Sequence, residues 1–355
     1  MQSSKLQTKR SLTTSGVSCS EGSVSASSAK RFLQENTSET LLTTSERKEC
    51  DETVDEDNSY ELEGIESLFD DLEEGPKKQA KIPVSRKLLD IMLEKKITCY
   101  DDWTKEDNLD AYIEFSSFRN FNQDCAKFYK VVSVKQLKYR FNDFYTKKLV
   151  SNEESKIQKV LKLQFPKWNA KGANWFCNLL KMHFDSELGK RNTLCFRGVS
   201  NAGKSQLMAT FTQWIVGNHY GKPSNNKNSN FPFDNCVNKR MILWEEPMIT
   251  IDNIEDVKLI MGGEELRADI KFDSMMNVGK TPVIITTNNR LSKHCEPQKD
   301  ALSKRMFEFY FPKALDSKWF PITGEDWQIF FDKYYQENIT LAKVYEFLKT
   351  KPFQN

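Results

Sequence analysis

The stretch RGVSNAGKSQ, residues 197–206, decides the fold expected for this sequence. Gly198 is followed by four residues and then by Gly203, Lys204 and Ser205, which is the spacing of a phosphate-binding loop. In such a loop, backbone N–H groups surround a phosphate at the positive end of a helix, and the lysine adds a charge. The serine hydroxyl is a ligand for Mg²⁺. We therefore expect ATP and Mg²⁺ at Gly198, Val199, Ser200, Asn201, Ala202, Gly203, Lys204 and Ser205.

The residues on either side of this loop support the motif. The apolar run TLCF, 193–196, leads directly into Gly198 and predicts a buried strand. The segment SQLMATFTQWIV, 205–216, has the apolar spacing of an amphipathic helix. Strand, loop and helix in this order are the context that the motif requires. A simple glycine turn between a strand and a helix would leave Lys204 and Ser205 unexplained.

Two further apolar runs end in polar residues that suit nucleotide chemistry. RMILWEEP, 240–247, contains Glu245 and Glu246, and TPVIITTNN, 281–289, contains Asn288. A phosphate loop needs a carboxylate on a neighbouring strand to hold the metal and orient water. We place Glu245 beside Ser205 at the metal. Which of the two glutamates is the base and which is linked to the metal stays open. Asn288 is expected to bind the attacking water or the γ-phosphate.

The composition divides the chain into regions. The whole chain is nearly neutral, with 52 Lys and Arg against 50 Asp and Glu, but residues 1–45 are rich in Ser and Thr and residues 46–74 are acidic. Such segments cannot bury enough apolar surface to fold, so we predict a disordered tail over 1–80. The remaining chain is expected to form a helical region (81–185), an α/β core with a parallel central sheet (186–315) and a helical C-terminal segment (316–355).

Helical periodicity is clearest in two stretches of the 81–185 region. SRKLLDIMLEKK, 85–96, places Leu88, Leu89, Met92 and Leu93 on one face. VSVKQLKYRFNDFYTKKL, 132–149, does the same with Val134, Leu137, Phe141 and Phe144, and predicts one continuous helix.

Several classes of protein are disfavoured. The eight cysteines include no C-x-x-C pair and the three histidines are scattered singly, so we expect reduced thiols and no zinc site. No run reaches about 18 apolar residues, and the start has no apolar signal-peptide core. We therefore expect an intracellular protein that does not enter a membrane.

The order of the motifs is more specific than any one of them. The phosphate loop, LWEE, GGEELRADIKFDSMMNVGKTPVIITTN and ALSKRMFEFYF follow one another as in the superfamily 3 helicase domain. The chain resembles that domain of parvoviral large replication (non-structural) proteins over about residues 82–312. The resemblance implies an AAA+ ATPase that unwinds DNA during viral genome replication in the host nucleus. It also implies a homo-oligomeric ring, expected to be a hexamer, with single-stranded DNA in its channel. The helical region 81–185 is then the oligomerisation region.

Further site residues follow from the resemblance by position. Glu245 and Glu246 match the acidic pair, and Asn288 matches the sensor asparagine. Lys271 matches the lysine of a motif between the acidic strand and the asparagine strand. Arg305, just before the predicted strand MFEFYF, matches the arginine that similar proteins insert into a neighbouring subunit's ATP site.

The stretch from Gly262 to Lys280 is polar and predicts a hairpin facing the channel. We expect Lys271 and Lys280 to pair with DNA phosphates, and Phe272 to stack on a base or sugar. The alternative is a surface hairpin with ordinary charges.

The sequence departs from the family in two respects. Asp273 stands where family members often have lysine, which weakens the expected positive hairpin tip. The His-hydrophobe-His motif of the origin-nicking nuclease is also missing, because no two histidines lie two residues apart. The chain resembles the helicase half alone, so a separate nuclease or host replication proteins are expected partners. Two other functions stay open: an ATPase that does not translocate, and a relic that regulates replication or transcription by binding partners.

Overall fold

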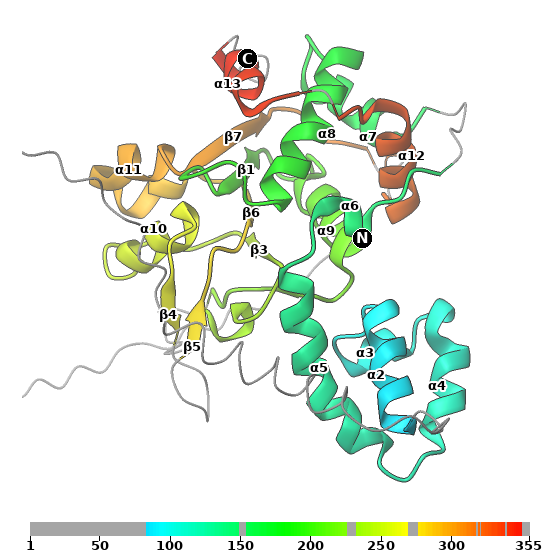
Figure 1. Cartoon of the computed structure of the whole chain (residues 1–355). Coiled ribbons are helices and arrows are strands. Elements are labelled where there is room, and N and C mark those ends of the chain that lie inside the picture. The colour runs from blue at the N-terminus through cyan, green and yellow to red at the C-terminus, as the bar shows by residue number, and fades with distance from the viewer. Residues whose placement is uncertain are drawn as a thin grey trace, which may run out of the picture. The chain divides into compact units, whose positions relative to one another are not determined.

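The computed structural model of the chain describes residues 83–148, 154–225, 232–268, 276–316, 319, 321–337 and 339–349. The tail 1–80, for which the composition predicts disorder, lies outside the described residues. In Figure 1 the strands of the central sheet lie between helices α10 and α11 on the left and α8, α9 and α12 on the right.

Five parallel strands form the central sheet, in the spatial order β2-β3-β6-β1-β7. They are β1 (Thr193–Gly198), β2 (Tyr220–Gly221), β3 (Met241–Glu245), β6 (Val283–Thr287) and β7 (Met306–Phe311). Parallel strands covered on both faces are continuous apolar runs, which is why the sequence identified four of them. The predicted fold class, an α/β protein with a parallel sheet, is confirmed.

Alternation along the strands gives the sheet two differently covered faces. Leu194 and Phe196 of β1 face a large hydrophobic cluster, whereas Cys195 between them belongs to a smaller cluster on the opposite face. The large cluster is covered by α7 (Lys156–Gln164), α8 (Ala170–Phe184), α9 (Lys204–Val216), α12 (Gly324–Tyr334) and α13 (Leu341–Lys349). The smaller cluster is covered by α10 (Ile254–Gly262) and α11 (Lys299–Ser303).

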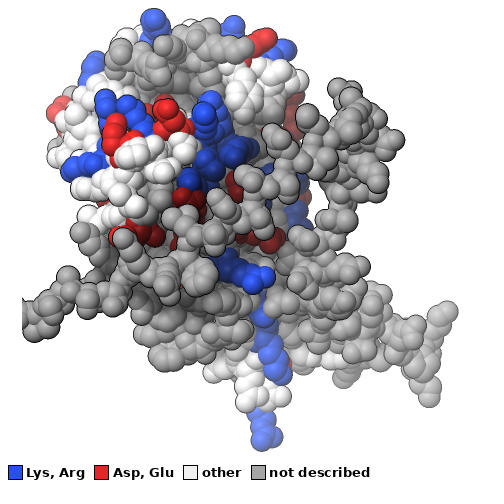
Figure 2. All heavy atoms as spheres, turned by 90° about the vertical axis from the view of Figure 1, so that its left-hand side faces the viewer, with Lys and Arg blue, Asp and Glu red and all other residues white. Residues whose placement is uncertain are grey.

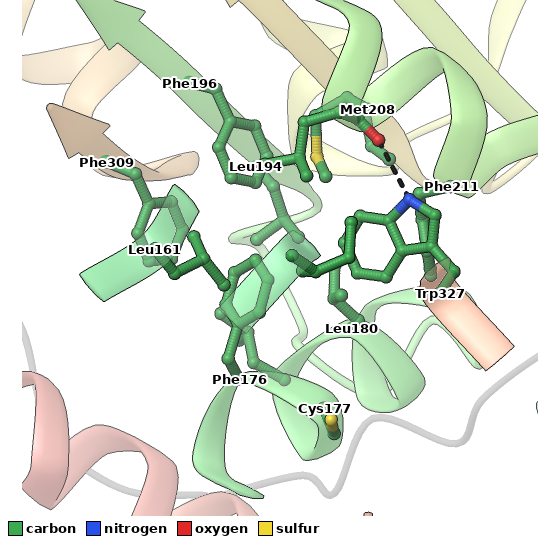
Figure 3. Packing of buried hydrophobic residues seen from close by; sticks show 14 of the residues in the cluster. Leu161, Phe176, Cys177, Leu180, Leu194, Phe196, Met208, Phe211, Phe309 and Trp327 are labelled. Atoms are coloured by element: carbon green, nitrogen blue, oxygen red, sulfur yellow. Dashed lines mark hydrogen bonds between the residues drawn. The ribbon is translucent and has the colours of Figure 1, made fainter. Parts of the chain in front are cut away.

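The large cluster joins segments that are far apart in the sequence, from Phe141 to Val344, and Figure 3 shows part of it. Phe176 of α8 and Phe309 of β7 pack with their ring centroids 5.8 Å apart. Trp327 of α12 packs on Phe211 of α9, and its indole N–H donates to the carbonyl of Leu207 at 3.2 Å. Helices α7 and α8, which the sequence assigned to the region before 186, therefore share a core with the sheet. The domain limits themselves stay predictions.

The helices that precede α6 have a core of their own. They are α2 (Val84–Glu94), α3 (Tyr100–Trp103), α4 (Leu109–Ser116) and α5 (Phe121–Leu137), and their cluster extends from Leu88 to Val132. The continuous helix predicted over 132–149 is wrong, because α5 ends at Leu137 and α6 (Phe141–Phe144) is separate. Leu137 is exposed, while Phe141 is buried in the large cluster, so the apolar spacing joined residues of two separate helices with different surroundings.

A short hairpin, β4 (Leu266–Ala268) with antiparallel β5 (Met276–Val278), precedes β6. The remaining elements are the 3₁₀ helices η2 (Glu106–Asn108), η3 (Asp234–Cys236), η4 (Leu291–His294) and η5 (Glu296–Gln298). Free thiols are found at Cys99, Cys125, Cys177, Cys195, Cys236 and Cys295. Within the described ranges, every helix is too short or too polar to cross a membrane.

Two buried histidines make the stability of this fold sensitive to acid. His183 and His219 are 1% and 0% exposed, and Nε2 of each contacts a backbone carbonyl oxygen, at 3.1 and 2.8 Å. Burial lowers the pKa of both imidazoles to about 4. The folded chain therefore holds them neutral at a pH where the unfolded chain would protonate them.

We expect the free energy of unfolding to fall as the pH drops from about 6.5 towards 4, because the unfolded state then binds more protons. Each histidine contributes on the order of 3 kcal/mol over this window, at 1.36 kcal/mol per pKa unit. Urea unfolding of the wild type and of His219→Gln at several pH values measures this pH dependence of the free energy of unfolding. His294→Gln, at an exposed histidine, is the control. An unchanged pH dependence in His219→Gln would contradict the assignment.

Candidate nucleotide site

The loop between β1 and α9 has a backbone that few residues fit. A Cβ atom on Gly198 would lie 2.0 Å from the carbonyl oxygen of Phe311 on β7, so the close approach of β7 requires glycine there. Gly203, immediately before α9, has φ 83°, and Asn201 has φ 59°, both in the left-handed region. The loop therefore turns sharply onto the amino end of α9, where the helix dipole is positive.

Lys204, the first residue of α9, is buried at the centre of this loop, with 5% of its surface exposed. Its Nζ donates to the carbonyl oxygens of Val199 at 2.7 Å and Gly198 at 3.2 Å. It also donates to Oδ1 of Asn288 at 2.9 Å, a residue just beyond the end of β6. Burial lowers the pKa of Lys204, and the negative charge of Glu246 acts in the opposite direction. The structure thus brings together the loop lysine and the polar end of β6.

A buried glutamine that sequence reasoning missed positions the loop. Gln164, at the end of α7, donates from Nε2 to the carbonyl oxygens of Lys313 at 2.7 Å and Ala202 at 3.4 Å. Its Oε1 accepts from the backbone N–H of Lys313 at 3.1 Å, and the N–H of Leu315 donates to the carbonyl of Asn201 at 2.8 Å. The loop is therefore fastened to the segment that follows β7. Nothing in the local sequence around Gln164 indicates this role.

Strand alternation places the predicted polar residues on the face that α9 covers. Ile284 on β6 and Leu243 on β3 both belong to the α9-side cluster. Glu245 lies two residues beyond Leu243, and Thr286 lies two beyond Ile284, so both share that face. Glu245 and Thr286 are also register partners across β3 and β6. The polar ends of β3 and β6 meet because parallel strands end at one edge of the sheet.

The two glutamates have different surroundings. Glu246 has φ 46°, and its carboxylate accepts from Thr287 Oγ1 at 3.1 Å and from the backbone N–H of Asn288 at 3.0 Å. The carboxylate of Glu245 makes no hydrogen bond or ion pair in the part of the chain that the structure describes. Glu246 is therefore already oriented against the end of β6, while Glu245 is available for a ligand.

The residues beside Glu245 fit a magnesium ion. Ser205 Oγ lies 3.2 Å from Thr286 Oγ1, and Thr286 is the register partner of Glu245. Mg²⁺ takes oxygen ligands, keeps several waters and often shares a phosphate, so one hydroxyl and one carboxylate suffice. Among the described residues, no group of three or more His, Cys, Asp or Glu side chains is placed to hold a metal. The site therefore suits a metal that arrives with a phosphate ligand.

Comparison with known proteins identifies the family of the chain. The family model described as parvovirus non-structural protein NS1 matches residues 72–347, which is most of the chain. The chain belongs to this family. Among curated relatives, Rep52 of adeno-associated virus 2 is 28% identical over 253 residues, covering 68% of this chain and 60% of Rep52.

Other NS1-family relatives match over shorter segments. The initiator protein NS1 of human bocavirus 3 is 33% identical over 152 residues, covering 40% of this chain and 19% of that protein. This NS1-family chain thus spans less than two thirds of the length of the relatives it matches. Among solved structures, a JCV helicase has a TM-score of 0.46 at 13% identity, over 78% of this chain and 94% of that one.

Arg305 of this NS1-family chain lies far from its own phosphate loop. It immediately precedes β7, whereas Gly198 pairs with Phe311 at the other end of that strand, about 20 Å away at ~3.3 Å per residue. Its Nε and Nη1 donate to the carbonyl oxygens of Lys258 and Ala301, both at 3.0 Å. Within a single subunit, the guanidinium therefore links the start of β7 to the backbone of α10 and α11 by hydrogen bonds.

The predicted DNA-binding residues are only partly described. Lys271 and Phe272 lie outside the described residues, as does Asp273. Lys280 lies exposed two residues beyond β5. Leu266 and Val278 anchor the base of the hairpin in the smaller cluster, so the base is part of the folded core.

Proposed function

We propose that this NS1-family protein hydrolyses ATP with Mg²⁺ and uses the energy to unwind DNA during viral genome replication. The contact between Lys204 Nζ and Asn288 Oδ1 carries this proposal, because it joins the loop lysine to the polar residue after β6, 84 residues away in the sequence. Family membership supports the same function. The acting form is a homo-oligomeric ring, a hexamer by resemblance, with single-stranded DNA in its channel and the host nucleus as its place of action.

Each residue of the site has a role that follows from its position. The loop backbone and Lys204 hold the β- and γ-phosphates, and Ser205 and Glu245 hold Mg²⁺. The ion, when bound, offsets negative charge on the phosphate oxygens. Glu246, held by Thr287 and the N–H of Asn288, accepts the proton of the attacking water.

The experiment that tests the function measures ATP turnover with and without single-stranded DNA, together with strand displacement and the mass of the assembled particle. We expect turnover that rises with the strand, and displacement that requires ATP. Turnover without displacement would favour an ATPase that does not translocate. Absence of turnover in an assembled ring would overturn the proposal and leave a binding-only role.

Replacing the two glutamates one at a time distinguishes metal binding from water activation. Glu245→Gln is expected to weaken Mg²⁺-dependent ATP binding, because a metal ligand loses its charge. Glu246→Gln is expected to bind ATP with Mg²⁺ normally but to turn it over roughly 10²–10⁴-fold more slowly, the usual contribution of a general base. Titration with a fluorescent ATP analogue and steady-state kinetics distinguish the two. Wild-type turnover in both variants would remove this pair from the mechanism.

A further inference from the structure

A basic hollow lies at the edge of the sheet opposite the nucleotide site. It has a volume of about 190 Å³ and is lined by residues of the segment before β3, by the end of β5 and by the end of α5. Arg240 directly precedes β3 and Thr281 comes shortly before β6, so the hollow lies where these parallel strands begin. Lys204 and Asn288 lie where the strands end, so the two sites are separate.

Among the residues that the structure describes, the charged residues that line this hollow are all basic. They are Lys239, Arg240 and Lys280. Arg240 is 7% exposed; its guanidinium donates twice to the carbonyl of Tyr139, at 3.1 and 3.2 Å, and lies 4.1 Å from the ring centre of Phe184. Arg240 is therefore held in place and adds a fixed positive charge behind the hollow.

The two lysines are available for a ligand. Within the described ranges, neither Lys239 nor Lys280 makes a side-chain hydrogen bond or an ion pair. A Cβ atom on Gly279, beside Lys280, would meet nothing within 4 Å, so the hollow is open there. Neither lysine has an ion-pair partner among the described residues, so their charges repel each other, and an anion between them would relieve that repulsion.

The positive charge extends from the hollow along the hairpin. Arg267 on β4 is the register partner of Asn277, which lines the hollow, and Arg267 is exposed and without an ion pair in the described chain. Figure 2 shows a narrow column of Lys and Arg side chains in the lower half of the face that it presents. The positive charge of Arg267, outside the hollow, suits a polyanion better than a single small anion.

We propose that this hollow holds one backbone phosphate of a single DNA strand, between Lys239 and Lys280. The inference rests on the proposed function and gives the DNA a contact outside the hairpin tip. Lysine ammonium groups act as point charges, which suits a phosphodiester passing across an open hollow. Enclosed sites for a free phosphate instead use helix amino ends or unengaged arginines, and the arginine here is engaged.

The test measures binding of a labelled oligothymidylate strand to the full chain at several salt concentrations. Each phosphate neutralised on a single strand contributes about −0.7 to the slope of log K against log salt. In the double variant Lys239→Ala/Lys280→Ala, the magnitude of this slope is expected to fall by about 0.7. Its affinity should fall by the same factor for strands of different sequence. Each single variant should lose no more than this, because both lysines serve one phosphate. Lys167→Ala, an exposed lysine between α7 and α8, is the matched control.

The outcomes separate this inference from the proposed function. An unchanged slope in a double variant that folds and assembles normally would overturn the inference alone, and a loss near 1.4 would indicate two separate contacts and overturn the single-phosphate assignment. A wild type that binds no strand would overturn both. Displacement of the strand by inorganic phosphate at constant ionic strength, in the wild type but not in the double variant, would indicate a free-anion site instead.

Discussion

Lys204→Ala is expected to lower ATP turnover by at least 10²–10³-fold, the effect of removing one charge-stabilising donor from a buried site. The wild-type ammonium is held by the carbonyls of Gly198 and Val199 and by Asn288, so it is already positioned where phosphate oxygens would lie. Alanine supplies neither charge nor donor. Steady-state hydrolysis and binding of a fluorescent ATP analogue would both be measured.

The matched control is Lys313→Ala, because Lys313 lies beside the same loop but exposes its side chain. Its contacts to Gln164 use backbone atoms, which alanine retains. We expect wild-type turnover in this control and a near-normal melting temperature in both variants. Wild-type hydrolysis in Lys204→Ala would place the nucleotide site elsewhere.

Arg305→Ala is expected to bind ATP nearly normally but to lose about 10³–10⁵-fold in turnover, if the arginine serves a neighbouring subunit. The reason is that an arginine inserted from outside stabilises charge that develops only in the transition state. The arginine is too far along β7 to reach its own phosphate loop. Lys304→Ala, the exposed neighbour, is the control and should keep wild-type turnover.

Mixing two inactive variants distinguishes an action of Arg305 on a neighbouring subunit from a structural role within its own subunit. Arg305→Ala mixed with Lys204→Ala should recover part of the activity, because some interfaces then combine an intact loop with an intact arginine. The structural alternative is that the bonds to Lys258 and Ala301 are the main role of Arg305. In that case the variant melts at a lower temperature, and mixed oligomers show no recovery.

Much of the nucleotide site was predictable, because it depends on local patterns. A glycine loop between an apolar strand and an amphipathic helix has one common structural solution, and Lys204 and Ser205 lie at the helix start as predicted. Glu245 and Asn288 follow apolar runs that are too continuous for anything but buried parallel strands. Their roles stay predictions, although the structure brings Asn288 to within a hydrogen bond of Lys204.

The sequence by itself determined the α/β class, the four main strands and the residues at their polar ends, since each of these rests on periodicity or spacing along the chain. The tertiary structure alone decided which strands are neighbours, that Gln164 fastens the loop, and that Lys239 and Lys280 share a hollow. It also decided that Leu137 and Phe141 lie in two separate helices, the first exposed and the second buried. The physical reason is that packing depends on contacts between residues that are distant in sequence. A local sequence pattern does not indicate which distant residues it will contact.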